Sequence, residues 1–336
     1  MQHSNQSASS SYTASPALAD HPDAVHVAFG VDAGYFRGMG VTITSVVKNN
    51  PELHFIFHVF AFSVSDDSRR RIEELAQKCG LVIHVHVLST DMLDAFSQFP
   101  CFRQHSLGTF IRLLIPNRLE GIAKKVLYLD ADILCFGNIA ELLSTDIDDC
   151  IAAAAHDEAE TTVKTQIPTL GIENGHYFNA GVMYINVDKW IAADIQNKAL
   201  SILTTRELVF ADQDALNIAL DGHIKYVDEK WNYRYHLVDF LSKGNHSLDV
   251  TEPFVFMHFT GPVKPWHDWC LHEAKTIFVN YQSMSSWSDV PLDGPKSSRD
   301  LKLFSKFLIK QNRTWEGIGW HIKYLGARFA KNLKSS

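Results

Sequence analysis

The sequence predicts an α/β protein with a mixed, mostly parallel sheet flanked by helices. Two observations point to this fold class. Short apolar runs rich in β-branched and aromatic residues alternate with segments of helical spacing, which is typical of a parallel sheet covered by helices. The chain has 336 residues, 46% hydrophobic and 21% charged, which suits one large globular domain with an appendage, or two domains.

The first half of the chain shows the clearest alternation. An apolar run ends at Gly30, and helical spacing follows over residues 39–47. Ser65 is a typical helix N-cap, and the helix it begins runs to Lys78 before Cys79-Gly80 ends it. The predicted strands of this half are residues 25–29, 53–62, 81–88 and 124–129.

The second half continues the pattern and then changes composition. Further strands are predicted at 151–155, 182–185 and 254–259, with a helix beginning near Asp188. After Pro295 the chain is rich in Lys, Phe, Ile, Trp and Arg. We therefore expect a main domain of residues 23–285 and a small helical C-terminal region of residues 286–336. Residues 1–22 are polar and Ser-rich, and we expect them to form a disordered leader.

Charge is distributed unevenly. The net charge of −7 gives no general reason to expect nucleic-acid binding. The segment 296–334 nevertheless carries ten Lys and Arg against two acids, while the rest of the chain is acidic. Within 301–333, apolar residues recur at helical spacing and basic residues fill much of the opposite side, which is the pattern of helices lying on an anionic membrane. The alternative is a pair of helices packed on the main domain with solvated charges.

The cysteines and the N-terminus favour a cytoplasmic location over a secreted one. The five cysteines include no pair at CxxC spacing, so a disulfide framework or a zinc knuckle is poorly supported. The polar N-terminus lacks the apolar core of a signal peptide, and no run of about 18 apolar residues is present to span a bilayer. We expect a cytoplasmic protein.

The strongest chemical candidate is Asp130-Ala131-Asp132, which directly follows a predicted apolar strand. In an open α/β sheet, ligands gather at the carboxyl ends of the strands. Two acids separated by one residue can both reach one hard cation, and oxygen ligands suit Mg²⁺ or Mn²⁺. The alternative is an ordinary acidic turn. The preceding strand favours a site, because acids beside a core are costly unless something pairs them.

The segment 258–266 is a second candidate. It offers a metal ligand in His258, a close backbone approach at Gly261 and a phosphate-binding cation in Lys264. Two prolines stiffen the loop around the lysine. The alternative is a Pro-rich surface loop in which the histidine has no role.

Three shorter segments are weaker candidates. Asp32 follows the first strand, where nucleotide-binding folds often contact base or ribose, although it also suits a turn beside Gly34. Residues 178–181 combine Asn with small residues that let a sugar lie against backbone, or form a plain turn. Residues 212–214 open a predicted helix, where one of the two acids is readily explained as a helix cap.

These segments, in this order, resemble glycosyltransferase family 8, and look most like the lipopolysaccharide core glucosyl- and galactosyltransferases of Gram-negative bacteria. The resemblance runs from about Val25 to Trp269, and its last string is quite specific. The strings that carry it are VAFGVD (27–32), TFIRL (109–113), LYLDAD (127–132), FNAGV (178–182), DQD (212–214) and HFTGPVKPW (258–266).

The resemblance implies a GT-A (Rossmann-like) fold, a UDP-hexose donor, a divalent ion (Mn²⁺ or Mg²⁺) and retention of the anomeric configuration. It implies that Asp130, Asp132 and His258 hold the metal, and that Gln213, Asp212 and Lys264 act in catalysis, with Lys264 countering charge on the leaving group. The residues that it implies for donor binding are Gly30, Asp32, Arg112, Asp130, Ala131, Asp132, Asn179, Ala180, Asp212, Gln213, Gly261 and Lys264.

The sequence departs from the family pattern at two positions. Gly34 stands where the best-known relatives have a nucleotide-contacting Asn, so side-chain help is lost there. Gln104 stands where a galactosyltransferase relative has an acceptor-side His, a difference that bears on the identity of the acceptor.

The resemblance also suggests the course of the reaction and the surroundings of the enzyme. An amide such as Gln213 is a poor nucleophile, so we favour same-face attack over double displacement, with the leaving phosphate taking the acceptor proton and Asp212 orienting the sugar. The implied acceptor is the lipopolysaccharide core, which places the enzyme peripherally at the inner face of the bacterial inner membrane. Two alternatives are a non-catalytic nucleotide-sugar binding protein and a glycogenin-like self-glucosylating enzyme.

Overall fold

The computed structural model describes residues 10–14, 21, 23–89, 91, 107–157, 167–173, 175–248 and 250–334. The chain divides into two compact units. The first comprises residues 1–233 with 254–257, and the second comprises residues 234–253 with 258–336. The domain boundary expected near residue 285 stays a prediction.

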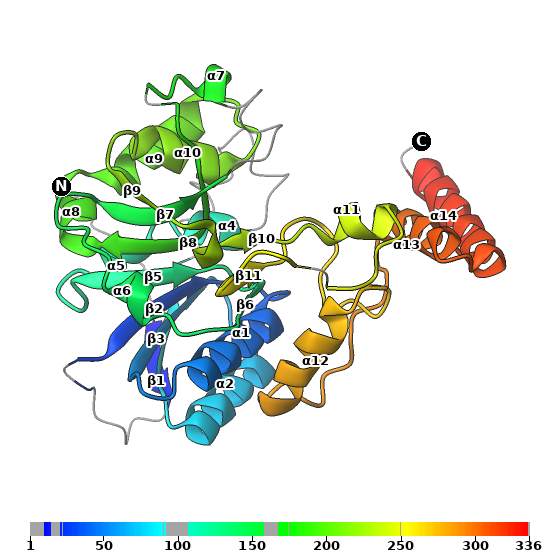
Figure 1. The fold of residues 1–336 in the computed structure, drawn as a ribbon, viewed down its shortest axis with the longest axis horizontal. Coiled ribbons are helices and arrows are strands. Elements are labelled where there is room, and N and C mark those ends of the chain that lie inside the picture. The colour runs from blue at the N-terminus through cyan, green and yellow to red at the C-terminus, as the bar shows by residue number, and fades with distance from the viewer. Residues whose placement is uncertain are drawn as a thin grey trace. The chain divides into compact units, whose positions relative to one another are not determined.

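An eight-stranded mixed sheet forms the centre of the first unit (Figure 1). The strand order is β1-β4-β3-β2-β5-β8-β7-β9. Pairing is parallel from β4 through β3 and β2 to β5 and again between β7 and β9, and antiparallel for β1–β4, β5–β8 and β7–β8. The predicted fold class is confirmed. The strands are β1 (Ser10–Ala14), β2 (Val25–Gly30), β3 (Phe55–Ala61), β4 (Val82–Val87), β5 (Lys125–Leu129), β7 (Ala152–His156), β8 (Phe178–Asn186) and β9 (Ile224–Val227).

Helices cover this sheet, and local sequence sets their ends. Ser65 accepts a hydrogen bond from the Ser68 amide at the start of α2, and Gly80 ends that helix with a left-handed backbone at φ 63°. The predicted cap and stop are therefore confirmed. The helices are α1 (Phe36–Asn49), α2 (Asp66–Cys79), α4 (Leu107–Ile111), α5 (Ile115–Arg118), α6 (Ala140–Leu143), α7 (Ile167–Leu170), α8 (Val187–Ala192), α9 (Ile195–Thr205) and α10 (Ala211–Ala219), with a 3₁₀ turn at Glu229–Trp231.

A three-stranded sheet has the order β10-β11-β6. It consists of β10 (Tyr233–Arg234), β11 (Phe256–His258) and β6 (Ile133–Cys135). Since β6 begins directly after Asp132 and β11 ends at His258, their pairing brings together two segments that are far apart in the sequence.

Strand β1 corrects one expectation. Residues 1–22 were expected to lack structure, yet Ser10–Ala14 pairs antiparallel with β4, in a register that places Ser10 opposite Val87. The five residues suit an edge strand because Tyr12 and Ala14 alternate with small polar residues that face outward. Most of the remaining residues of 1–22 lie outside the described residues.

The second unit is helical in its described part. A capping box starts α13, in which Ser297 and Asp300 each accept a hydrogen bond from the other's backbone amide. Gly317 allows α14 to cross α13 closely, because a Cβ there would lie 2.6 Å from Ile309 Cγ1. No helix among the described residues is both long and apolar enough to cross a membrane. The helices of this unit are α11 (Leu237–Ser242), α12 (Ala274–Met284), α13 (Ser298–Lys310) and α14 (Thr314–Lys334).

Candidate active site

A pocket opens at the carboxyl end of the parallel strands, where β2 and β5 end. It contains most of the residues predicted for the nucleotide and metal, which the chain supplies from three separate segments. The lining residues are Gly30, Asp32, Tyr35, Gly108, Thr109, Arg112, Asp130, Ala131 and Asp132. Sequence reasoning did not assign Tyr35, Gly108 or Thr109 to the site, although Thr109 opens the family string at 109–113.

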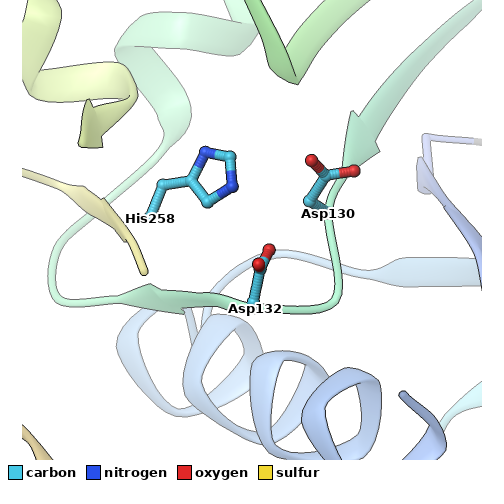
Figure 2. A group of neighbouring side chains, drawn as sticks. All are labelled: Asp130, Asp132 and His258. Carbon is cyan, nitrogen blue, oxygen red and sulfur yellow. The ribbon is translucent and has the colours of Figure 1, made fainter. Parts of the chain in front are cut away.

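Three predicted metal ligands lie together. One ligand atom from each of Asp130, Asp132 and His258 lies within 4.8 Å of the other two, and Figure 2 shows the three side chains facing one another. Asp130 and Asp132 follow β5, and His258 is the last residue of β11. Two carboxylates and one imidazole fit Mn²⁺ or Mg²⁺, which take oxygen ligands and tolerate a nitrogen. The donor set therefore fits the divalent cation that the sequence predicted.

Arg112 holds two carboxylates at the inner wall of this pocket. Its Nη2 lies 2.9 Å from Asp130 Oδ1 and its Nε lies 2.7 Å from Asp212 Oδ2. A third contact runs from Nη1 to the Ala180 carbonyl at 2.8 Å. Tyr128 adds to the group, since its hydroxyl donates to Asp130 Oδ1 at 2.6 Å. The ion pairs orient Asp130 without using all of its oxygen lone pairs.

Burial dominates the protonation of this group. It raises the pKa of Asp212 to about 7, with Arg112 opposing the rise and Asp130 adding to it. Burial also works to lower the pKa of Arg112, but the carboxylates of Asp130 and Asp212 outweigh it and raise that pKa. The guanidinium is therefore the fixed positive charge that two neighbouring acids share.

The two predicted amide residues meet at a buried acid. Gln213 Nε2 donates to Asp157 Oδ2 at 3.2 Å, and Asn179 Nδ2 donates to the same oxygen at 3.3 Å. Asn232 Nδ2 in turn donates to Asn179 Oδ1 at 2.8 Å. Sequence reasoning missed Asp157, although it directly follows β7 just as Asp130 follows β5. Tyr177 and Asn232 were also missed and carry no local signal.

Of the acids in 212–214, Asp214 has the structural role. Its Oδ2 accepts the backbone N–H groups of Val209 and Phe210, and its Oδ1 accepts the Tyr177 hydroxyl at 2.5 Å. Asp214 therefore fixes the backbone of Val209 and Phe210, which directly precede α10. Ala211 at that turn has φ 40°, a left-handed conformation that costs a non-glycine residue on the order of 1–3 kcal/mol.

Gly30 and Asp32 both have local structural roles in addition to lining the pocket. A Cβ at Gly30 would lie 3.0 Å from the Gly108 carbonyl oxygen, so a glycine lets α4 pack closely on β2. Asp32 Oδ1 accepts the Gly34 amide at 3.0 Å, which is the turn contact considered as an alternative.

In the second unit, the segment after β11 is a tight loop. Lys264 is buried, and its Nζ donates to the Phe259 carbonyl at 2.6 Å. Gly261 has φ 85°, and a Cβ there would lie 2.3 Å from His236 Nε2. Glycine is thus required by the loop itself. The acceptor-side position Gln104 lies outside the described residues.

Family models match almost the whole chain. The model described as Glycosyl transferase family 8 matches residues 26–270. The model described as Glycosyl transferase family 8 C-terminal matches residues 274–327. The first match alone covers well over half of the chain.

Curated relatives agree with these matches. Lipopolysaccharide 1,3-galactosyltransferase of Salmonella typhimurium is 34% identical over 316 residues, covering 91% of this chain and 92% of that protein. Lipopolysaccharide 1,2-glucosyltransferase of Escherichia coli K12 is 32% identical over 314 residues, with 91% and 92% covered.

Solved structures share the fold. An active-site Gln-to-Glu variant of LgtC is similar with a TM-score of 0.67 and 25% identity, covering 78% of this chain and 96% of that one. The galactosyltransferase LgtC in complex with donor and acceptor sugar analogues has a TM-score of 0.65 and 24% identity over the same shares.

Proposed function

Because the chain belongs to glycosyltransferase family 8 and is a glycosyltransferase, we propose that it moves glucose or galactose from a UDP-hexose onto the lipopolysaccharide outer core, with retention and in α linkage. The cluster of Asp130, Asp132 and His258 carries this proposal. A protein that only bound a nucleotide sugar would not need such a ligand set, since it has no leaving group to stabilise.

During transfer, negative charge develops on the leaving diphosphate, and the site has groups that can stabilise it. A divalent cation at Asp130, Asp132 and His258 would neutralise negative charge that develops on the diphosphate. We assign Lys264 to the same leaving group and Gly261 to the backbone beside it. Lys264 would exchange its present contact with the Phe259 carbonyl for a phosphate oxygen.

The remaining residues would hold the donor. We assign Gly30 and Asp32 to the uridine, on the strength of their position in the pocket wall. Arg112, Asp212 and Gln213 would surround the hexose together with Asn179 and Ala180. Arg112 and Asp212 are already fixed by their ion pair, so they would orient the sugar hydroxyls without reorganising.

Retention of configuration is proposed to follow from same-face attack. An amide is a poor nucleophile, and Gln213 already uses both ends of its side chain in hydrogen bonds. The acceptor hydroxyl would then attack from the side of the departing phosphate, and a phosphate oxygen would take its proton.

The acceptor implies a membrane surface. The names of both relatives include lipopolysaccharide. Because lipopolysaccharide is anchored in a membrane, an enzyme that uses it as the acceptor has to work at the bilayer surface. We propose that the exposed face of α14 attaches the protein to the anionic inner face of the inner membrane. In α14 the exposed large apolar residues are Trp315, Ile318, Ile322, Leu325 and Phe329.

Donor hydrolysis tests the reaction directly. Purified protein is incubated with UDP-glucose and UDP-galactose separately, with Mn²⁺ or with EDTA, and UDP release is measured. We expect release from one donor only when the metal is present. Asp130→Asn should lower the rate by about 100-fold or more, because it removes a charged ligand from the cation.

Asp188→Asn is the matched control, since Asp188 is an exposed acid on α8 that lies outside the pocket. It should hydrolyse the donor at the wild-type rate. Release of UDP that persists in EDTA, or near-normal hydrolysis by Asp130→Asn, would show that the metal assignment is wrong.

A further inference from the structure

Asp157 is a buried carboxylate with an unusual pair of neighbours. It is 6% exposed and lies directly after β7. Its Oδ2 accepts hydrogen bonds from the side-chain amides of Gln213 and Asn179, the two amide residues assigned above to the donor sugar. One acid therefore contacts both.

The other end of each amide is also fixed. Gln213 Oε1 accepts the Ala180 backbone N–H at 3.1 Å, and Asn179 Oδ1 accepts the Gly181 backbone N–H at 3.0 Å. A backbone N–H can only donate and a carboxylate can only accept. Turning either amide over would place an oxygen against Asp157 and an NH₂ group against a backbone N–H, so only one orientation satisfies all four contacts.

We infer that Asp157 is a positioning residue, which fixes the amide orientation of Gln213 and Asn179 before the donor binds. The inference rests on the proposed function. Transfer builds positive charge at the anomeric carbon, and an amide oxygen stabilises such charge whereas an NH₂ group opposes it. An amide held in advance stabilises the transition state without having to reorganise.

Tyr177 provides an internal comparison. Its hydroxyl accepts a hydrogen bond from Gln213 Nε2 at 3.2 Å and donates to Asp214. A hydroxyl can donate or accept, so Tyr177 could meet a flipped Gln213 amide by donating to its oxygen and giving up Asp214, whereas Asp157 has no hydrogen to donate. Loss of its hydroxyl removes these two contacts but leaves the orientation of the Gln213 amide set by Asp157 and Ala180.

The kinetic test compares Asp157→Asn with Tyr177→Phe in donor hydrolysis without acceptor. Asparagine keeps the shape of aspartate but offers its own NH₂ group, so the amides no longer have a single satisfied orientation. We expect kcat to fall by about tenfold or more in Asp157→Asn while the donor KM stays within about threefold, and to fall much less in Tyr177→Phe.

Two kinetic outcomes would overturn the inference. If Asp157→Asn hydrolyses the donor normally and loses only transfer, Asp157 acts on the acceptor. If Tyr177→Phe and Asp157→Asn lower kcat equally, the orientation of the amide is not what Asp157 controls.

A stability cycle tests the same contact without any activity. Gln213→Glu places a second carboxylate against Asp157 and should lower Tm. Adding Asp157→Asn provides a donor opposite the introduced carboxylate but removes the acceptor of the Asn179 amide, so the double variant should recover part of that Tm. Additive Tm changes would sink the inference. If the variants show this coupling but the wild-type protein hydrolyses neither donor, the proposed function is refuted and the structural role of Asp157 is not.

Discussion

Gly261 is the residue at which the loop after β11 leaves no room for a side chain. Its φ of 85° already disfavours other residues, and a Cβ would also lie 2.3 Å from His236 Nε2. We expect Gly261→Ala to destabilise the protein more than its backbone cost of about 1–2 kcal/mol. Urea unfolding measures the difference.

Gly222 is the matched control for this substitution. It has a similar φ of 76°, but nothing lies within 4 Å of a Cβ built there. Gly222→Ala should therefore show the backbone cost alone. His236→Ala introduced beside Gly261→Ala should return the loss to the control value, because it removes the ring that the Cβ would meet. Equal losses at the two glycines would refute the clash.

Single residues differ in how far sequence predicts them. Asp130 was predictable because an acid directly after an apolar strand is costly unless paired. Asp157 follows β7 in the same way but was missed, because the poly-alanine run before it ends in His156 and resembles no motif. A cap was expected from one of the two acids in 212–214, but α10 has no side-chain N-cap, and Asp214 instead accepts the amides of Val209 and Phe210 before the helix. Its bond to Tyr177 depends on how α10 packs on β8, which no local pattern encodes.

A row of histidines crosses β2, β3 and β4. His58 lies between His26 and His86, with ring nitrogens 2.9 Å and 3.3 Å from theirs, and stacks on His84. Each contact needs an N–H on one ring and an unprotonated nitrogen on the other, so two neighbouring rings cannot both be protonated. Burial, followed by the neighbouring histidines, lowers the pKa of His58 from 6.5 to about 2, and burial also lowers that of His86 to about 4.

These histidines predict a fold that weakens in mild acid. The unfolded chain takes up protons as the pH falls through 6.5, whereas folded His58 stays neutral, so stability present above pH 6.5 is lost below it. At pH 5 His58 alone should cost about 2 kcal/mol. Urea unfolding at pH 7 and pH 5 should show a smaller loss for His58→Gln than for wild type.

His223→Gln is the control for that measurement, because His223 is an exposed histidine outside the row. It should keep the wild-type difference between pH 7 and pH 5. An equal difference in His58→Gln would mean that the buried histidine row is not the source of the acid sensitivity.

At the scale of elements, the sequence predicted the buried strands of the central sheet. It missed the edge strand β1, which depends on pairing with its neighbour. Strands β2, β3, β4 and β5 were predicted almost to their ends, because continuous apolar runs mark buried parallel strands. Strand β8 begins at Phe178, earlier than predicted, because residues 178–181 are also buried within the sheet. The edge strand β1 is stabilised by its partner β4 and has no apolar run of its own.

The whole molecule carries its charge asymmetrically, with a basic C-terminal segment on an acidic chain. In the second unit, α13 and α14 pack against each other, and the Ser305 hydroxyl donates to the Gly317 carbonyl at 2.8 Å. This packing leaves one stripe of α14 in solvent, where Trp315 is 86%, Ile322 is 64% and Phe329 is 68% exposed. An apolar stripe beside basic residues is what an anionic bilayer binds.

Replacing Trp315, Ile322 and Phe329 together by serine should abolish binding to vesicles that contain phosphatidylglycerol. The three side chains are exposed, so the variant should fold and hydrolyse the donor as wild type does. Cosedimentation with such vesicles, and with neutral phosphatidylcholine vesicles for comparison, measures the effect. Because the attraction has a charge component, wild-type binding should also weaken as salt rises. Vesicle binding that survives the triple substitution, or deletion of residues 297–336, would show that α14 is not the attachment surface.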